Sequence, residues 1–281
     1  MRCDCHVHVV GPIDRYPQVA ERTYTAGPAP LETLQALGAS RGIDRFVIVQ
    51  PSFYGDDNSM LLDTLSRLGG KGRGVAVVEP QKVEKAELTR LRAAGVRGLR
   101  ANLYSPLAGK PIGTLADAFY GIEALARSIE GHVELVAPIE ILAKNADLIR
   151  QSSVPVVIDH YGLYGSSRPS DAVGRALLTI AELEHVWIKL SAPYRHDKGQ
   201  FNTIPDSAWV KAFLQIAPDR CVWGSDWPHP PLHAIHQGPT VHSAYRPISY
   251  SDLVDRFLES IPGNVSPARV MSENAHRLYG F

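Results

Sequence analysis

A chain of 281 residues with 29 basic and 29 acidic side chains has no net charge at pH 7, which argues against nucleic acid or an acidic membrane surface as a partner. No apolar stretch reaches the roughly 18 residues that a membrane-spanning helix needs, and the first expected strand begins almost at Met1, which leaves no room for a signal peptide. The length suits one α/β barrel, which commonly takes about 250 residues. We therefore expect a single domain over residues 1–281 and a cytoplasmic protein.

Short apolar runs alternate along the chain with stretches of helical spacing. We expect strands at Arg2 to Val9, Phe46 to Pro51, Gly74 to Glu79, Gly98 to Leu103, His132 to Val136, Pro155 to His160, Val186 to Ser191 and Cys221 to Ser225. We expect helices at Leu31 to Arg41, Asp57 to Leu68, Val83 to Ala94, Thr114 to Ile129, Ile139 to Gln151, Ser170 to Leu183, Pro205 to Ile216, Tyr250 to Ile261 and Ser266 to Leu278.

This alternation predicts a single (β/α)8 TIM barrel. Continuous apolar runs such as Phe46-Val47-Ile48-Val49 indicate burial on both faces, as in a parallel sheet that helices enclose. The competing architecture is an open doubly wound sheet, but no Gly-x-Gly-x-x-Gly follows the first strand.

Polar residues at the carboxyl ends of the expected strands are the candidates for a site, because the active sites of such barrels lie there. His6 and His8 are two residues apart in the first strand, so they share one face. The later strand ends supply Gln50, Ser52, Glu79, Arg100, Asn102, His160, Lys189, Ser191 and Asp226. Any one of these could be structural, but together they predict a mouth with histidines, a carboxylate and an arginine.

Four segments resemble the amidohydrolase superfamily: Asp4-Cys5-His6-Val7-His8, Ile158-Asp159-His160-Tyr161-Gly162, Trp223-Gly224-Ser225-Asp226-Trp227-Pro228-His229, and the ending Glu273 to Phe281. The most similar branch is the amidohydrolase-related group that includes 2-pyrone-4,6-dicarboxylate lactonase, sugar-lactone hydrolases and galactarolactone isomerase. The resemblance runs from one terminus to the other. It implies a distorted barrel with His6, His8, His160 and Asp226 in the catalytic site.

The resemblance also raises the question of a metal. In metal-dependent relatives the strand-one pair, a strand-five histidine and the strand-eight aspartate hold a divalent cation, usually zinc. Here the segment His132 to Pro138 has a histidine only at its start, and Glu134 is expected to be structural or to contact substrate rather than to bind metal. We favour a site without metal; the alternative is one zinc or manganese ion held by His6, His8 and Asp226.

Two arginines occupy positions where relatives bind substrate carboxylates, Arg100 and Arg195, and we favour this role for each over the alternative of a surface salt bridge. Ser52 and Tyr54 lie where relatives place hydroxyl contacts to substrate. The pyrone-lactonase pattern has a further arginine shortly after the fourth strand, where this chain reads Leu103-Tyr104-Ser105-Pro106. A lactone with one carboxylate, or a less charged and more aromatic lactone, therefore fits better than a pyrone dicarboxylate.

The predicted function is the hydrolysis of a carboxylated or sugar-acid lactone. Asp226 would activate water, and His6, His8 and His160 with Arg100 would polarise the carbonyl. A lactone isomerase would use the same residues with a substrate hydroxyl in place of water. A metal-dependent non-oxidative decarboxylase is a third possibility, and a non-catalytic binding barrel a fourth.

Overall fold

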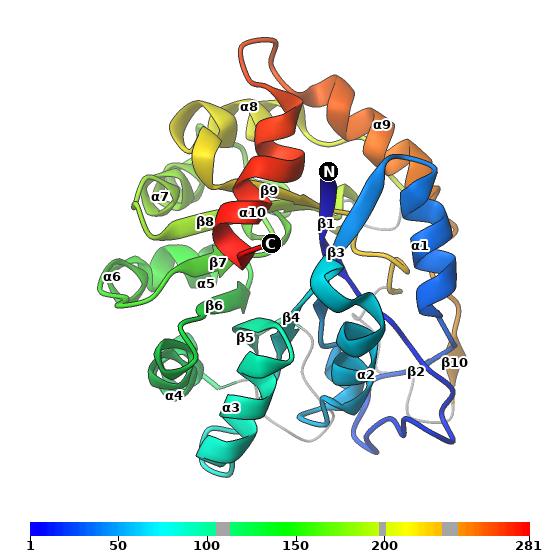
Figure 1. Ribbon diagram of the computed structural model, residues 1–281. Coiled ribbons are helices and arrows are strands. Elements are labelled where there is room, and N and C mark those ends of the chain that lie inside the picture. The colour runs from blue at the N-terminus through cyan, green and yellow to red at the C-terminus, as the bar shows by residue number, and fades with distance from the viewer. Residues whose placement is uncertain (105–112, 197–200, 232–240) are drawn as a thin grey trace.

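The computed structural model describes residues 1–104, 113–196, 201–231 and 241–281, and over these residues the chain forms a nearly closed parallel barrel ringed by helices (Figure 1). Eight strands lie in the order β1-β3-β4-β5-β6-β7-β8-β9, which confirms the expected barrel. Their bounds are β1 Arg2–Val7, β3 Ile43–Val49, β4 Gly72–Ala76, β5 Val96–Asn102, β6 His132–Val136, β7 Val156–Ile158, β8 Val186–Ser191 and β9 Cys221–Gly224.

The barrel closes between its first and last strands just beyond the end of β9. Val7 forms a parallel bridge with Trp227, the amide of His8 donates to the carbonyl of Trp227 over 2.7 Å, and the amide of Asp226 donates to the carbonyl of His6 over 2.8 Å. At Gly224 an added Cβ would lie 2.6 Å from the Cβ of His6, so only glycine lets the two strands approach this closely. The closure thus places His6 and His8 of the first strand beside Asp226, which follows the last strand.

Each expected helix is present, with ends shifted by a few residues. The helices are α1 Leu31–Ala39, α2 Ser59–Leu68, α3 Lys85–Ala93, α4 Leu115–Ser128, α5 Ile139–Lys144, α6 Ala146–Arg150, α7 Ala172–Ala181, α8 Ser207–Ile216, α9 Tyr250–Ser260 and α10 Asn274–Tyr279. The stretch expected as one helix at Ile139 to Gln151 is divided at Asn145, whose side chain donates to the carbonyl of Ile141. A π-helical turn, Arg269–Glu273, leads into α10.

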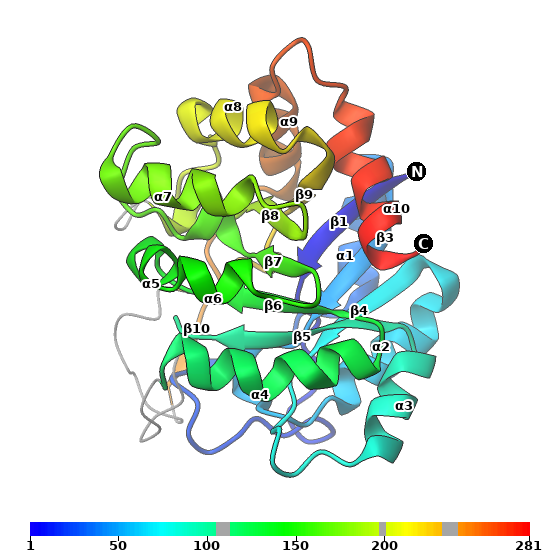
Figure 2. The same cartoon turned by 90° about the vertical axis from the view of Figure 1, so that its left-hand side faces the viewer.

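The two ends of the barrel have different covers. At the amino end, the buried ring of Tyr279 from α10 packs with Cys3, Cys5 and valines of β3, β4 and β9. The chain termini lie at this same end, and the strands run away from it toward the opposite mouth (Figure 2).

A small parallel sheet of β2 (Thr25–Ala26) and β10 (His242–Ser243), which the sequence did not suggest, is the second sheet. No helix among the described residues is long and apolar enough to cross a membrane.

Candidate active site

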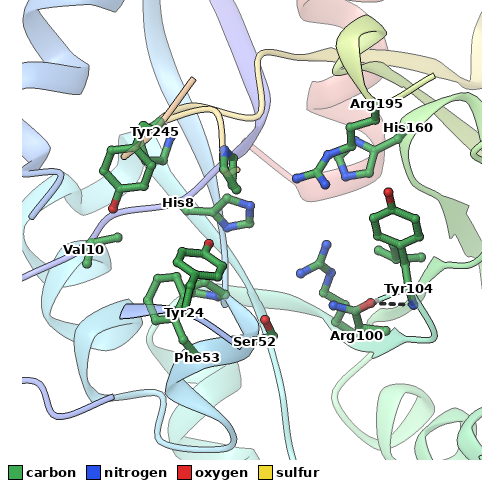
Figure 3. Close-up of a pocket in the computed structure, with 15 residues that line it drawn as sticks. His8, Val10, Tyr24, Ser52, Phe53, Arg100, Tyr104, His160, Arg195 and Tyr245 are labelled. Carbon is green, nitrogen blue, oxygen red and sulfur yellow. Dashed lines mark hydrogen bonds between the residues drawn. The ribbon is translucent and has the colours of Figure 1, made fainter. Parts of the chain in front are cut away.

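A cavity opens at the carboxyl ends of the strands and contains about 460 Å³ of space, counted with its open mouth. His8, Arg100, His160 and Arg195 face one another across it (Figure 3). Its remaining wall includes Tyr24, Ser52, Phe53, Asn102, Tyr104 and Tyr245. The cavity therefore combines cationic and imidazole groups with aromatic surface, which suits a small ligand that has both a ring and an anionic group.

A bulge in β1 aims His6 into the barrel. Three steps along β1, from Asp4 to Val7, pair with only two steps along β3, so β1 carries one extra residue there. The carboxylate of Asp4 accepts hydrogen bonds from the amides of His6 and Ser225 over 3.2 and 2.9 Å. Asp4 thus accepts hydrogen bonds from the backbone on both sides of the seam where β1 meets the end of β9. The extra residue lets Cys5 pack in the barrel core while its neighbour His6 faces the polar groups above it.

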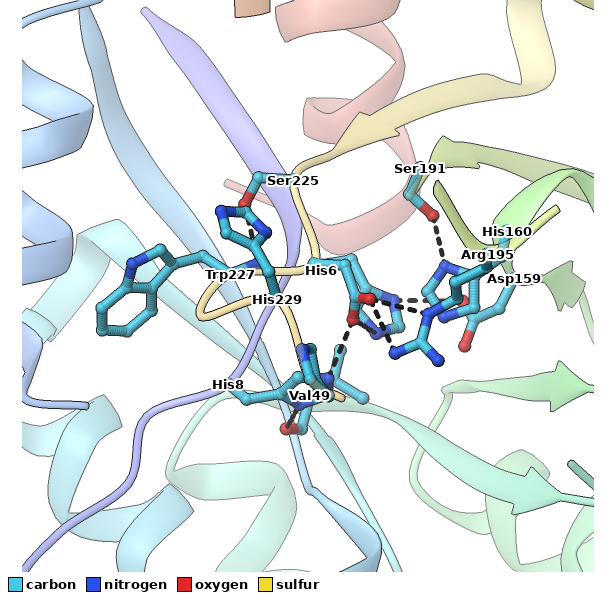
Figure 4. Close-up of polar contacts among 12 residues, drawn as sticks. His6, His8, Val49, Asp159, His160, Ser191, Arg195, Ser225, Trp227 and His229 are labelled. Carbon is cyan, nitrogen blue, oxygen red and sulfur yellow. Dashed lines mark hydrogen bonds and ion pairs between the residues drawn. The ribbon is translucent and has the colours of Figure 1, made fainter. Parts of the chain in front are cut away.

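Asp226 is fully buried, and positively charged or hydrogen-bonding side chains surround its carboxylate. Figure 4 shows three of its neighbours, His6, His8 and Arg195. The Oδ2 atom of Asp226 accepts from Nε of Arg195 over 2.7 Å and from the hydroxyl of Tyr194 over 2.8 Å, and it forms an ion pair with Nη2 of Arg195 at 2.7 Å. Its Oδ1 atom lies 3.2 Å from Nε2 of His8 and 3.6 Å from Nε2 of His6. Burial alone would raise the pKa of Asp226, but Arg195 outweighs burial and holds this pKa well below the usual aspartate range.

The loops that carry the functional side chains use left-handed backbone at residues other than glycine. The φ angle is 59° at Asp226, 50° at His160 and 52° at Ala192, which precedes Arg195 by three residues. Such conformations cost of order 1–3 kcal/mol each and cluster at functional sites, where the surrounding structure maintains them. Three successive loops are thus bent so that their side chains return toward the barrel axis.

Hydrogen bonds fix the orientation of two rings at the cavity. Nδ1 of His8 lies 2.8 Å from the carbonyl oxygen of Val49, which can only accept, so Nδ1 carries a proton. Nδ1 of His160 lies 2.8 Å from the hydroxyl of Ser191. Burial, and next Arg195, lower the pKa of His160 well below its ordinary value. His160 is therefore a neutral imidazole that can donate from Nε2 when the Ser191 hydroxyl donates to Nδ1.

A layer of buried ions lies beneath the cavity. Nζ of Lys189 contacts a carboxylate oxygen of Glu134 and lies 3.2 Å from Oδ1 of Asp159, and all three residues are fully buried. Arg100 joins the layer through Asp159 at 3.3 Å and Glu134 at 3.7 Å. Burial opposes ionisation of both carboxyl groups, but Lys189 outweighs it and lowers the pKa of each. The layer therefore pairs two anions with two cations.

The residues predicted to form the site take different places. His8, His160, Arg100, Arg195 and Ser52 line the cavity, whereas His6 lies one layer deeper, between Asp159 and Asp226. Tyr54 is buried, and its hydroxyl accepts from the amide of Gly11.

Other strand-end residues have structural partners or lie outside the described residues. Glu79 pairs with Lys82 at the surface, and Glu134 pairs with Lys189 as a structural ion. Ser105 and Pro106, which replace the family's extra arginine, lie outside the described residues.

Sequence reasoning assigned no role to Asp4 or Asp159, and it noted Lys189 only as the end of a strand. One signal could have indicated Asp159, since it lies next to His160 at the end of an apolar run, but alternation would have placed the two side chains on opposite faces. The left-handed turn that begins at His160 removes this constraint.

Two groups of side chains among the described residues could hold a metal ion: His6 with His8 and Asp226, and His6 with Asp159 and His160. The His8–Asp226 separation of 3.2 Å fits a shared cation, because ligand atoms about 2.0–2.2 Å from a tetrahedral zinc lie roughly 3.3–3.5 Å apart. Nε2 of His6 is buried without a hydrogen-bond partner among the described residues. It could be a third ligand only if the ring proton is on Nδ1, where Lys189 also makes contact.

The fold and this mouth of histidines and aspartate define a barrel hydrolase of the amidohydrolase type. The chain belongs to the amidohydrolase family, a family of enzymes whose profile matches residues 3–281.

Among its relatives is a 4-sulfomuconolactone hydrolase of Rhizobium radiobacter, which is 30% identical over 99% of this chain and 89% of its own. A 2-pyrone-4,6-dicarboxylate hydrolase of Comamonas testosteroni is 34% identical over 82% of this chain and 77% of its own. A solved structure of a probable 2-pyrone-4,6-dicarboxylic acid hydrolase from Acinetobacter baumannii, with citric acid bound, is 25% identical, has a TM-score of 0.77, and matches 100% of this chain and 99% of its own.

Proposed function

We propose that this protein hydrolyses a carboxylated lactone, with Asp226 as the general base and acid. One observation carries the proposal: the Asp226 carboxylate contacts His8, which lines the same cavity as His160, Arg100 and Arg195. The curated relatives support the reaction class, since they are named as hydrolases of 4-sulfomuconolactone and of 2-pyrone-4,6-dicarboxylate.

In the proposed reaction a water molecule attacks the lactone carbonyl while Asp226 accepts its proton. His160 donates a hydrogen bond to the oxyanion that develops, Arg100 adds positive charge to the same cavity, and the loss of one such donor can cost roughly 3 kcal/mol of barrier. The C–O bond of the ring then breaks, and Asp226 returns the proton to the leaving oxygen. His6, which does not reach the cavity wall, supports Asp226 from beneath.

Arg195 has a double part in this scheme because it lines the cavity and also pairs with Asp226. While both contacts of its guanidinium are on Oδ2, the carboxylate is a weak base. A substrate carboxylate held between Arg100 and Arg195 would draw the Arg195 guanidinium away and leave Oδ2 free to accept a proton. Substrate binding would thus activate the base.

The substrate class follows from the rest of the wall. Arg100 presents a guanidinium, which suits a carboxylate, and its other contacts are with Asp159 and the carbonyl of Gln50. Tyr24, Tyr104 and Tyr245 add aromatic surface. We therefore propose a compact lactone, planar or partly unsaturated, with one carboxylate.

We propose that the reaction proceeds without a metal, since Glu134 pairs with Lys189 at the strand where metal-dependent relatives have a histidine. In the alternative, His6, His8 and Asp226 would hold one zinc or manganese ion, which would polarise the carbonyl or lower the pKa of water.

A screen of carboxylated, sugar and aryl lactones tests the proposal, with the protein assayed after exhaustive chelation and again with added zinc or manganese. We expect ring opening to a hydroxy acid or oxo acid at a rate that chelation does not change. A change of ring size without net addition of water would instead indicate an isomerase, and release of carbon dioxide a decarboxylase. A rate that vanishes on chelation and returns with metal would overturn the metal-free scheme.

A further inference from the structure

Lys189 is a buried cation that the proposed chemistry does not use. It extends from β8 into the barrel, is fully buried, and contacts Glu134, Asp159 and His6. Burial alone would lower the pKa of Lys189, but Asp159 and Glu134 outweigh burial and raise this pKa, so the amine is charged. Removing an ammonium group from water costs free energy, which ion pairs and hydrogen bonds must offset. The two carboxylates supply the ion pairs, and His6 is the third group that Lys189 contacts.

Two groups compete for Nδ1 of His6. Nζ of Lys189 lies 3.3 Å from it and can only donate, whereas Oδ1 of Asp159 lies 3.3 Å from it and can only accept. A neutral imidazole has one ring proton. If Nδ1 accepts from Lys189, the proton is on Nε2; if Nδ1 donates to Asp159, Nε2 has a free lone pair. The first arrangement makes His6 a hydrogen-bond donor toward Asp226, and the second makes it a metal ligand.

The geometry favours Lys189. Its contact with Nδ1 has the distance and angles of a hydrogen bond, whereas the Asp159 contact has only the separation of an ion pair, without an N–H aimed at the oxygen. The charged Nζ of Lys189 beside Nδ1 opposes a second proton on the ring, so the ring is neutral. On the other side of the ring, Nε2 is buried, lacks a hydrogen-bond partner among the described residues, and lies 3.6 Å from Oδ1 of Asp226.

We propose that Lys189 is a positioning residue: it donates to Nδ1 of His6, holds the ring proton on Nε2, which faces Asp226, and so prevents His6 from acting as a metal ligand. Only His8 and Asp226 then remain of the candidate ligand set around His6, His8 and Asp226. The same ammonium neutralises the carboxylates of Glu134 and Asp159, which would otherwise attract a cation into the barrel.

The test begins with the tautomer of His6 in the free protein, stripped of metal by chelation and labelled with ¹⁵N at histidine. Long-range ¹H–¹⁵N correlation spectra distinguish a protonated ring nitrogen from a bare one, and the loss of one ring from the spectrum of His6→Gln assigns the signal. We expect a protonated Nε2 and a bare Nδ1. A protonated Nδ1 with a bare Nε2 would overturn the proposal.

A charge-balanced variant tests the cause. Lys189→Met combined with Glu134→Gln removes one cation and one anion. Among the residues that the structure describes, it leaves Asp159 as the charged group in contact with His6 Nδ1. Glu134→Gln alone is the matched control that keeps Lys189. In the double variant we expect the ring proton to move to Nδ1 and the affinity for zinc, measured by competition with a chromophoric chelator, to rise about 10- to 100-fold over the control. The same tautomer and zinc affinity in both variants would refute the proposal.

These measurements use the protein without substrate, although the inference rests on the proposed function in taking Asp226 as the catalytic base. A failed lactone screen with the expected tautomer would reject the substrate and leave Lys189 in its role. A reversed tautomer with active hydrolysis would reject the role of Lys189 alone. Should the double variant not fold, the tautomer in the natural protein decides the matter.

Discussion

At the scale of single residues, the cavity divides its arginines between two tasks. Arg195 pairs with Asp226 in addition to lining the cavity, whereas Arg100 lines the cavity and rests on the buried ion layer. A guanidinium held by a buried carboxylate has a fixed direction, so it can bind substrate with little loss of side-chain freedom. Arg100 is therefore the residue from which we expect most of the binding of the substrate carboxylate.

Replacing Arg100 by lysine tests this role while keeping the charge of the ion layer. We expect KM for every active carboxylated lactone to rise about 10- to 100-fold, the equivalent of roughly 1.5–3 kcal/mol for a hydrogen bond to a charged group, with a smaller change in kcat. Steady-state kinetics measures both. Arg97→Lys is the matched control, because Arg97 lies on the same strand and donates to the carbonyl of Arg92. Equal KM values for the natural protein and Arg100→Lys would contradict the assignment.

At the scale of elements, the seam between β1 and β9 determines whether the site exists. Asp4 joins the seam to helix α9, because its second carboxylate oxygen accepts from the hydroxyl of Tyr250 over 3.0 Å. Burial outweighs these hydrogen bonds and raises the pKa of Asp4 to about 6. The folded protein therefore keeps a proton on Asp4 at pH values where the unfolded chain, with a pKa near 3.8, has lost it.

This difference predicts how stability depends on pH. The folded state binds more protons than the unfolded state between about pH 4 and pH 6, so the free energy of unfolding should fall as pH rises through this window, by about 1.4 kcal/mol per unit at most. Asp4→Asn has no titrating group at this position. The free energy of unfolding of the variant minus that of the natural protein should therefore increase by on the order of 2–3 kcal/mol from pH 4 to pH 7. Urea unfolding at several pH values measures the difference.

Parallel stability curves for Asp4→Asn and the natural protein would contradict that account. Tyr250→Phe gives a second check. It removes a hydrogen bond that stabilises the Asp4 anion, so the pKa of Asp4 should rise further and the loss of stability should extend to higher pH.

The strands were predictable because the parallel barrel buries both of their faces, which leaves apolar runs in the sequence. The side-chain directions at the site were less predictable. A strict alternation along β1 would place Cys3, Cys5 and Val7 on one face and His6 and His8 on the other, but the bulge lets Cys5 and His6 both face inward. A bulge arises from pairing with β3 and β9 and has no local signal. The ion layer was hidden for a related reason, since its members come from four neighbouring strands, β5 to β8, whose pairing register decides which side chains meet.

At the scale of the whole molecule, stability and chemistry occupy opposite ends of the barrel. Tyr279 covers the amino end as a fully buried side chain whose hydroxyl has no hydrogen-bond partner among the described residues. Arg73 donates to the carbonyl of Tyr279 over 3.1 Å and anchors this end of α10 to β4. The catalytic mouth is at the other end, so changes at Tyr279 should affect folding and leave substrate binding alone.

We expect Tyr279→Ala to lower the free energy of unfolding by about 3–5 kcal/mol, as for other large buried aromatic residues, with KM unchanged in the fraction that remains folded. Tyr279→Phe keeps the ring and removes a buried hydroxyl without a partner, so it should be neutral or stabilising by about 1 kcal/mol. Chemical unfolding of the two variants measures both effects. A loss of stability in Tyr279→Phe equal to that in Tyr279→Ala would show that the hydroxyl, and not the ring, holds the end of the barrel.

The most direct test of the central claim follows the oxygen of water into the product, with the natural protein and Asp226→Asn compared in ¹⁸O-water. Asparagine suits the test because it keeps the size of the side chain and tolerates the left-handed backbone at this position. We predict one ¹⁸O atom per ring-opened acid with the natural protein, and a rate at least about 10³-fold lower for the variant, as expected when a general base is lost. A product without ¹⁸O, or an Asp226→Asn variant as active as the natural protein, would contradict the account.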